Sequence, residues 1–296
     1  QKVSHFLMGF WNVEGIHKLF NLDVDLSSYL SKFQILGFSE TWHTSSVPNL
    51  PSYFTKYSIF SRQATKTHVY GRPSGGLILA VSKELDATIF DITNSWIFIK
   101  FYYENCVYII GLVYFKPYTE SYKLQMVDFD EILNKITELY IDVKLVCGGD
   151  WNARVGLLNN NFDEYIFENC NLKCYRKSYD KIVNVRGNLL LNILETFGLI
   201  VVNGRTYSDF PANYTFQSTI GQSIIDLIVV NHDAAVSLYD MEIVCLSDLS
   251  DHLFCKLSMY GYNSCYKTGN INSDRVEKRT IIKWDDSKIE LFQKEL

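Results

Sequence analysis

The chain of 296 residues contains ten apolar or alternating runs of strand length, and no other feature limits its fold as strongly. Short runs of this kind, bounded by turn-forming residues, are typical of β-strands with a buried face. One small sheet cannot hold so many strands, so the pattern predicts two sheets. The runs are Phe6–Phe10, Ile35–Phe38, Leu77–Val81, Trp96–Tyr103, Val107–Tyr114, Val143–Cys147, Leu199–Val202, Ile224–Val230, Met241–Val244 and Leu253–Leu257.

Helical periodicity is found in far fewer places. Apolar residues recur at helical spacing from Leu124 to Tyr140 and again from Leu189 to Phe197. Gly198 suits the C-terminal cap of the second helix, and a third helix is expected over about Asp23 to Lys32. Many strands and few helices favour an α/β fold in which two sheets pack face to face with helices outside.

The composition is that of an ordinary soluble globule, with 47% hydrophobic and 21% charged residues. The sequence has no run of about eighteen apolar residues, and its first ten residues lack the basic head and cleavage site of a secretory signal. We therefore expect an intracellular protein that is not secreted and has no membrane span. The seven cysteines, odd in number and irregularly spaced, suit reduced core thiols.

Two places combine short polar side chains in a way that suits phosphate chemistry. Asp150 and Asn152 follow a strand-like run, and side chains two residues apart in an extended segment face the same way. Asp251 and His252 precede another run, while Asp226 lies inside an apolar run, where a buried acid needs a partner. Taken singly, the two internal acids could cap a turn or a loop, and the histidine could be a core residue.

Three more polar residues, Asn12, Glu40 and Tyr114, end apolar runs. Each has a purely structural alternative: a turn cap, a surface ion pair, and one more strand aromatic among 20 tyrosines. Their shared position matters more than any one of them, because sites are assembled where distant strands end.

Taken in order, these motifs resemble those of the endonuclease/exonuclease/phosphatase superfamily, which contains DNase I and the exonuclease III type abasic-site endonucleases. More narrowly, roughly residues 5 to 260 resemble the endonuclease domain of non-LTR (LINE-type) retrotransposons. The resemblance implies a four-layer α-β-β-α sandwich of two packed, mainly antiparallel sheets with outer helices. The motifs that carry it are Trp11-Asn12-Val13-Glu14-Gly15, Ser39-Glu40-Thr41-Trp42, Val113-Tyr114, Gly149-Asp150-Trp151-Asn152-Ala153-Arg154, Lys181-Ile182-Val183-Asn184 with Asn203-Gly204-Arg205, Tyr214-Thr215-Phe216, Ser223-Ile224-Ile225-Asp226 and Ser250-Asp251-His252.

The resemblance also implies the members of an active site. Mg²⁺, for which Mn²⁺ could substitute, is the only cofactor expected, and it prefers carboxylate oxygens and retained waters. The residues implied in catalysis are Asp150, Asn152, Tyr114, Asp226 and His252. Those implied at the metal are Glu40, Asn12, Asp251 and Glu14. Those implied in substrate binding are Thr215, Ser223 and Arg154.

The implied roles follow from what phosphodiester cleavage requires. Asp150 would orient or deprotonate the attacking water, and Asn152 would help to hold the phosphate. Asp226 would fix and charge His252, which would act either as a base or as a cation. Tyr114 would donate to the phosphate or assist the leaving group.

The implied function is a magnesium-dependent DNA endonuclease that nicks double-stranded DNA, leaving a 3′-hydroxyl and a 5′-phosphate. In retrotransposons that hydroxyl primes reverse transcription, so a reverse transcriptase in the same polypeptide and a nuclear location at the time of action are expected. One alternative is an abasic-site endonuclease or another phosphodiesterase of the same fold. A second is a catalytically silent DNA-binding or interaction module, which the intact set of site residues disfavours.

The net charge of −5 and the pI near 5.7 argue against a protein that coats nucleic acid. Two clusters of basic residues are candidate contacts to the DNA backbone in spite of this net charge. A run of charges is, however, often only a solvated face. The first is Lys56, Arg62, Lys66, Arg72 and Lys83, and the second is Lys173, Arg176, Lys177, Lys181 and Arg186. Arg72 is added to the substrate-binding candidates.

Two further expectations concern segments near the end of the chain. Residues 215–226 predict a hairpin with a turn at Gly221, and in the family the corresponding hairpin approaches the minor groove. Residues 1–260 are expected to form the catalytic domain, and residues 261–296 a polar linker that leads to the reverse transcriptase. The alternative for the last segment is a genuine carboxy-terminal tail.

Overall fold

The computed structural model describes residues 5–66, 71–117, 122–246 and 249–260, and the predicted linker lies outside them. The described elements belong to the first of two units into which the chain divides. Their helices are α1 (Val24–Leu30), α2 (Tyr122–Leu139), α3 (Val185–Thr196) and α4 (His232–Val236), with short 3-10 helices η1 (Ile16–Asn21), η2 (Ser52–Lys56), η3 (Lys83–Leu85) and η4 (Glu164–Phe167).

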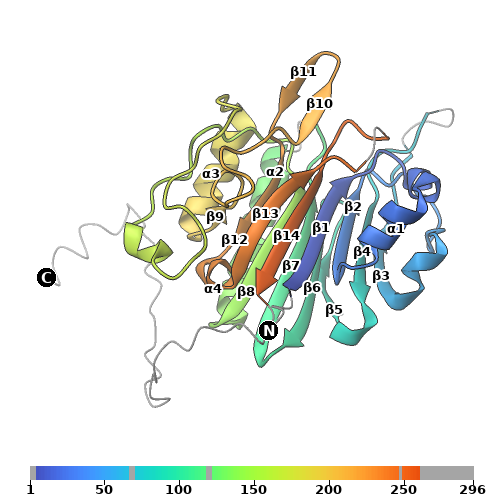
Figure 1. The fold of residues 1–296 in the computed structure, drawn as a ribbon, viewed down its shortest axis with the longest axis horizontal. Coiled ribbons are helices and arrows are strands. Elements are labelled where there is room, and N and C mark those ends of the chain that lie inside the picture. The colour runs from blue at the N-terminus through green and yellow to red at the C-terminus, as the bar shows by residue number, and fades with distance from the viewer. Residues whose placement is uncertain (1–4, 67–70, 118–121, 247–248, 261–296) are drawn as a thin grey trace, which may run out of the picture. The chain divides into compact units, whose positions relative to one another are not determined.

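Two six-stranded sheets form the centre of this unit (Figure 1). The first sheet has the order β13 (Leu238–Val244), β14 (Phe254–Tyr260), β1 (His5–Asn12), β2 (Ile35–Ser39), β4 (Leu77–Ser82) and β3 (Tyr57–Arg62). The second sheet has the order β5 (Thr88–Ile92), β6 (Trp96–Tyr103), β7 (Cys106–Tyr114), β8 (Val143–Asp150), β12 (Asp226–Val230) and β9 (Ile200–Val201).

Strand pairing is mainly antiparallel, as expected, but each sheet is mixed. In the first sheet β1 pairs with β2 in parallel, and in the second β7 pairs with β8 in parallel. These parallel pairs occupy the middle of their sheets. Because parallel strands end at the same edge, Asn12 lies opposite Ser39, and Tyr114 lies opposite Asp150. The carboxyl ends of four central strands therefore reach the same side of the unit.

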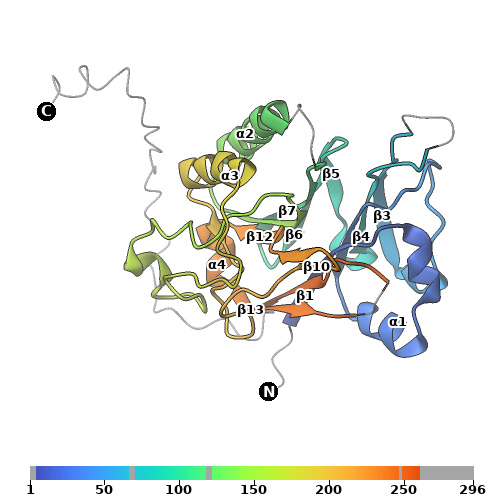
Figure 2. The same cartoon turned by 90° about the horizontal axis from the view of Figure 1, so that it is seen from above.

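Figure 2 shows the layers of helices and sheets from above. Three clusters of apolar side chains lie between these layers. The largest lies between the two sheets and contains side chains from both, such as Phe10 of β1 and Ile110 of β7. A second packs α2 and α3 against the outer face of the second sheet. A third packs α1 and η1 against the first sheet. The order helix, sheet, sheet, helix confirms the predicted four-layer sandwich.

The three predicted helices are present, with local signals at their ends. The side chains of Asp23 and Asn184 accept hydrogen bonds from main-chain amides in the first turns of α1 and α3. Gly198, with φ of 60°, follows α3 in the left-handed conformation that a helix end favours. In α2, Leu124 and Leu139 are exposed, although the spacing placed them on its apolar face. The buried face consists of Tyr122, Met126, Phe129, Ile132, Leu133 and Ile136.

All ten predicted runs contain a strand, whereas β3, β5 and helix α4 were not predicted. The hairpin is present as β10 (Phe216–Ser218) and β11 (Gly221–Ser223). Its turn is formed by residues 219–220, so the prediction of a turn at Gly221 was one residue late. A second tight turn joins β6 to β7 through Glu104 and Asn105, both with positive φ, as a type I′ turn requires.

The six described cysteines are all free thiols, as expected, but only Cys147 and Cys255 are buried in the core, and Cys245 is exposed. Among the described residues, no helix is both long enough and apolar enough to cross a lipid bilayer.

Candidate active site

A cavity of about 450 Å³ opens at the edge where the four central strands end. Its lining comes from both sheets, from the loop after β8, from the start of α3 and from the β10–β11 hairpin. The lining residues are Asn12, Glu14, Glu40, Trp42, Arg72, Tyr114, Pro117, Asp150, Asn152, Arg154, Asn184, Arg186, Phe216, Ser223, Ile225 and His252. We call this cavity the cleft. It gathers most of the residues that the sequence singled out.

Register brings the two internal acids together. Strand β12 runs antiparallel to β8, and its first residue, Asp226, pairs directly with Asp150, the last residue of β8. Both side chains are almost fully buried. Two buried carboxylates need partners, and these are Asn12 at the end of β1, Asn152 after β8 and His252 just before β14.

His252 is the main partner of Asp226. Its Nδ1 lies 2.9 and 3.1 Å from the two carboxylate oxygens, and its ring is only 6% exposed. Burial alone would lower the pKa of His252, but the surrounding carboxylates, Asp226 first and then Asp150 and Glu14, together outweigh burial and raise the pKa to about 9. At neutral pH the imidazole is therefore protonated, and its Nε2–H can serve as a charged donor.

Asn12 and Ser250 hold this pair in place. The Asn12 amide Nδ2 donates to Asp150 Oδ2 at 3.0 Å and lies 3.3 Å from His252 Nε2. The Ser250 hydroxyl donates to the Asn12 carbonyl at 2.7 Å and accepts the His252 amide at 3.1 Å. Ser250 thus fixes the backbone of both neighbours, a role that the sequence did not reveal.

Asp150 has an unusual acidity. Burial raises its pKa to about 7, the nearby Asp226 charge adds to the rise, and His252 opposes it. Asn152, with φ of 47°, folds back so that its amide and its Nδ2 both donate to the Asp150 carboxylate at 3.0 Å. The same Nδ2 donates to the Phe115 carbonyl at 2.8 Å. As placed, Asn152 positions Asp150, because its amide hydrogens are engaged within the protein.

Glu40 lies across the cleft, directly after β2, with φ of 50°. Its Oε2 accepts hydrogen bonds from the Trp42 indole at 2.5 Å and from the Gly75 amide at 2.9 Å, and its Oε1 accepts the Tyr114 hydroxyl. Burial and the Glu40 charge raise the pKa of Tyr114 well above its usual value, so the phenol stays protonated. These hydrogen bonds hold the Glu40 carboxylate in one orientation, and its oxygens retain further lone pairs.

Two groups of side chains could hold a cation. Asp150, Asp226 and His252 offer ligand atoms within 4.8 Å of one another. A histidine with a raised pKa, bound through Nδ1 to a carboxylate, is however a poor metal ligand, because metal binding requires the neutral ring. The carboxylate of Glu40 and the side-chain amide oxygen of Asn12 supply the oxygen ligands that Mg²⁺ prefers. The donor chemistry of the cleft therefore fits a hard cation on the Glu40 side.

The two remaining metal candidates differ in position. Glu14 lines the cleft, but its Oε2 accepts from Lys18 Nζ at 3.4 Å and from the Asp251 amide at 3.2 Å. Asp251 itself is exposed and is not among the lining residues. Its main chain, rather than its carboxylate, makes a contact at this point: the Asp251 carbonyl accepts a hydrogen bond from the Gln217 amide at 2.8 Å.

The substrate-binding candidates divide in the same way. Thr215 is fully buried, and its hydroxyl accepts the amides of Ile225 and Asp226 at 3.1 and 3.0 Å. It therefore supports Asp226 and does not line the cleft, contrary to the expectation of a phosphate contact. Ser223 and Arg154 do line it.

Three arginines line the cleft, each with a fixed partner. Arg154 forms a two-pronged ion pair with Asp180, at 2.6 and 2.8 Å. The Arg72 guanidinium lies 3.9 Å from the centre of the Trp42 ring. Arg186 lies 4.2 Å from the centre of the Tyr122 ring and donates to the Lys116 carbonyl at 2.8 Å.

Sequence reasoning missed or misread some of the lining. Trp42 had no predicted role beyond its place in a motif, yet its indole donates to Glu40 and its ring lies against the Arg72 guanidinium. Phe216 also lines the cleft, with its ring centre 4.9 Å from that of His252. Of the two basic clusters, only Arg72 and Arg186 reach the cleft. Arg176 is buried and donates to the carbonyls of the protein interior.

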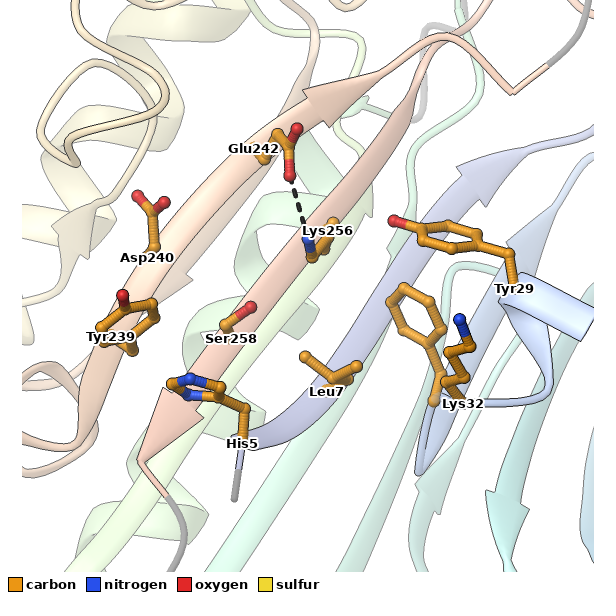
Figure 3. Close-up of a pocket in the computed structure, with 10 residues that line it drawn as sticks. His5, Leu7, Tyr29, Lys32, Tyr239, Asp240, Glu242, Lys256 and Ser258 are labelled. Atoms are coloured by element: carbon orange, nitrogen blue, oxygen red, sulfur yellow. Dashed lines mark hydrogen bonds and ion pairs between the residues drawn. The ribbon is translucent and has the colours of Figure 1, made fainter. Parts of the chain in front are cut away.

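A second cavity of the same volume lies on the outer face of the first sheet, beside α1 (Figure 3). It is crossed by the Lys256–Glu242 ion pair at 2.9 Å, and the rings of His5 and Tyr239 stack at one end. Its lining shares no residue with the cleft, and it is separate from the strand ends at which the cleft opens.

Comparison with known proteins gives a consistent picture. The model of a family described as endonuclease–reverse transcriptase matches residues 108–256, just over half of the chain. This range contains Tyr114, Asp150, Asp226 and His252. Among curated proteins, none matches the sequence.

Solved structures share the fold at low sequence identity. The endonuclease domain of TRAS1, a telomere-specific non-LTR retrotransposon, is 16% identical, with a TM-score of 0.56 over 86% of this chain and 98% of that chain. The AP endonuclease LMAP from Leishmania major is 12% identical, with a TM-score of 0.62 over 87% and 88%. The 3′ phosphatase NExo from Neisseria, bound to a product DNA hairpin, is 16% identical, with a TM-score of 0.56 over 86% and 99%.

Proposed function

Because this chain belongs to the endonuclease–reverse transcriptase family, with a DNase I-like fold, we propose that it nicks double-stranded DNA with the help of Mg²⁺. The products are a 3′-hydroxyl and a 5′-phosphate, and the hydroxyl serves to prime reverse transcription by a domain of the same polypeptide. One observation above all supports this: the Asp226–His252 pair and Asp150, to which Asn12 donates, lie at one cleft with Glu40 and the Tyr114 hydroxyl bound to it.

Asp150 takes the proton of the attacking water. Its pKa of about 7 matches the needs of a general base, since the group is part-ionised at neutral pH and accepts a proton readily. Asn12 and Asn152 aim its carboxylate through hydrogen bonds of 3.0 Å. Precise aim matters because the water must attack in line with the leaving oxygen.

His252 acts as a cation and not as the base. Held by Asp226 and protonated at neutral pH, it directs its Nε2–H toward a phosphoryl oxygen, where negative charge accumulates as the bond breaks. Tyr114, protonated across the working pH range, is a neutral donor for the departing sugar oxygen or for the phosphate.

Glu40 and the Asn12 side chain would hold the metal ion. A divalent cation there would supply positive charge against the phosphoryl and leaving oxygens. The protein fixes Glu40 through Trp42, Gly75 and Tyr114, so the carboxylate needs no rearrangement to bind a cation.

Nicking of supercoiled plasmid tests the proposal. We expect relaxed circles with Mg²⁺, none with chelator, and a loss of at least about 100-fold for His252→Ala. His232→Ala, which changes an exposed histidine in α4, is the matched control and should nick normally. DNA ligase should reseal the nicks, since it requires a 3′-hydroxyl and a 5′-phosphate.

Two outcomes would redirect the proposal. Cleavage confined to duplexes with an abasic site would make the chain an abasic-site endonuclease of the same fold. DNA binding without cleavage under any divalent metal would reject the enzyme and leave a binding module.

A further inference from the structure

One basic segment lies outside the cleft and has no part in the proposed chemistry. Residues 172–181, between β8 and α3, follow a period of two in which alternate side chains are exposed. The outward residues are Lys173, Tyr175, Lys177, Tyr179 and Lys181. The acid in this segment, Asp180, points inward and is bound to Arg154. We call the five outward residues the Lys/Tyr ladder. It lies in the yellow-green chain of Figure 1.

The ladder has a fixed backbone even though it is not part of either sheet. The amides of Lys173, Lys177 and Tyr179 donate to carbonyls of residues 204–212 at 2.9 to 3.2 Å. The alternate, inward side chains hold the segment from beneath. Arg176 donates to the Asn203 carbonyl at 2.8 Å. These bonds fix which side chains of the segment face outward, although the segment bends at several residues.

Aromatic rings widen the ladder on both sides. Phe210 lies with its ring centre 5.6 Å from that of Tyr175, and Tyr214 stacks with Tyr179 at 6.3 Å and 25°. Lys173 and Lys177 lie over the Phe210 ring at 4.6 and 5.3 Å. Tyr175 and Tyr179 nevertheless keep 49% and 55% of their surface exposed, so their rings are available to a ligand.

We propose that the Lys/Tyr ladder binds single-stranded DNA. Alternating cations and exposed rings fit a flexible polyanion whose bases are free to stack, because every base has a π-face. A duplex buries its bases and would use only the lysines. An acidic peptide would explain the lysines but not the tyrosines.

The choice of DNA rests on the proposed nicking activity and on the position of the ladder. Its last residue, Lys181, precedes Asn184 and Arg186, which line the cleft. The Tyr214 hydroxyl donates to the Tyr179 carbonyl at 3.4 Å, and Phe216, two residues further on, also lines the cleft. A strand freed at the nick would leave the cleft beside the ladder.

Fluorescence anisotropy tests the ladder with the full chain in chelator, so that cleavage plays no part. The probe is a labelled single-stranded DNA oligonucleotide of mixed sequence. We expect Tyr175→Ala and Tyr179→Ala each to weaken binding about tenfold, whereas Tyr175→Phe keeps the ring and stays near wild type. Lys177→Ala should reduce the slope of log K against log salt by about 0.7.

Tyr102→Ala is the matched control. Tyr102 is a 67% exposed tyrosine of β6 with Lys100 5.7 Å from its ring centre, and it lies outside the Lys/Tyr ladder. Its loss should leave binding unchanged. Thermal melts of each variant show whether the fold is retained, and Tyr175→Phe separates ring loss from misfolding.

Three results would overturn the proposal: ladder variants that bind as wild type does, equal weakening of single strands and duplex, or tighter binding of RNA of the same sequence. The first means no ladder site, the second a phosphate-only surface, and the third an RNA surface. Failure of nicking with ladder binding intact would reject the proposed function alone.

Discussion

Asn12 is the residue through which the two sheets meet at the site. It ends β1 of the first sheet, and its side chain donates to Asp150 at the end of β8 in the second. The sequence could indicate Asn12 and Asp150, because each ends an apolar run. It could not indicate Trp42, since an indole after a strand looks like packing until its donor is seen on Glu40. Side chains that act through other side chains leave little trace in a single sequence.

The acidity of His252 depends on Asp226, which gives a pH prediction. In Asp226→Asn the carboxylate that contributes most to raising the pKa of His252 is gone while burial remains, so the pKa should fall well below its value of about 9. We expect the alkaline limb of nicking to move to lower pH by the same amount, with about 100-fold lower activity at pH 8. Nicking rates from about pH 5 to pH 10, with NMR titration of the histidine, measure both.

The same pair affects stability with a defined sign. A histidine whose pKa is raised by folding adds stability that is complete below its unfolded pKa of about 6.5 and is lost as pH rises through 9. Urea unfolding should show the gap between wild type and Asp226→Asn narrowing over this range. An unchanged alkaline limb in the variant would contradict the assignment of His252 as the cation.

Glu40 gives a second residue-scale prediction. Glu40→Gln keeps the shape and one oxygen but removes the charge that a hard cation prefers. The Mg²⁺ concentration for half-maximal nicking should therefore rise about 10- to 100-fold. Glu138→Gln, an exposed acid of α2, is the control. If the two variants show the same metal dependence, the metal is held elsewhere, for example at Asp150.

At the scale of elements, every central strand was predicted, and so were the edge strands β9 and β13, whereas the edge strands β3 and β5 were not. The ten predicted runs became strands because their residues are buried on one or both faces. β3 and β5 lie at the edges of their sheets, and their side chains are mostly half-buried or exposed. A partly exposed strand needs no continuous apolar run. Helix α4 spans only five residues, too few for a helical period to be recognised.

Gly149 shows how closely two central strands approach. It has φ of 137°, and a Cβ placed on it would lie 2.1 Å from the Val113 carbonyl oxygen of β7. Gly149→Ala should destabilise the protein by about 3 kcal/mol or more and disturb Asp150 next to it. Gly198→Ala meets no atom within 4 Å and carries only the cost of φ at 60°, about 1 kcal/mol. Urea unfolding compares them, and equal losses would contradict the steric argument.

At the scale of the whole molecule, the sequence predicted two packed sheets but not their register. Composition and strand count predict a sandwich, yet only the register of β12 and of β7 against β8 places Asp226 and Tyr114 opposite Asp150. Register depends on contacts between segments far apart in the chain, which no local pattern encodes. The distribution of charge appears only at the same scale, because the fold brings Arg72 and Arg186 into the cleft lining, a placement that the net charge of −5 does not describe.

Salt dependence tests this distribution of charge. Each arginine that neutralises a DNA phosphate contributes about 0.9 to the slope of log K against log salt. Arg72→Ala and Arg186→Ala should each lower the slope for duplex DNA by about that amount, as measured by anisotropy in chelator. Arg62→Ala is the control, because Arg62 is exposed, lies outside the cleft lining and binds Asn94 at 2.8 Å. Equal slopes for all three variants would mean that DNA is bound elsewhere.

The turn at Glu104 and Asn105 closes β6 onto β7 at the end of β7 opposite Tyr114. An inserted or deleted residue within β7 would shift the strand by one position and swing the tyrosine to the other face. The same change in the turn alters only a surface loop. Insertions and deletions are therefore tolerated in the turn but not within β7, whose far end carries Tyr114. The turn is thus the place to open the chain for circular permutation or to insert a reporter.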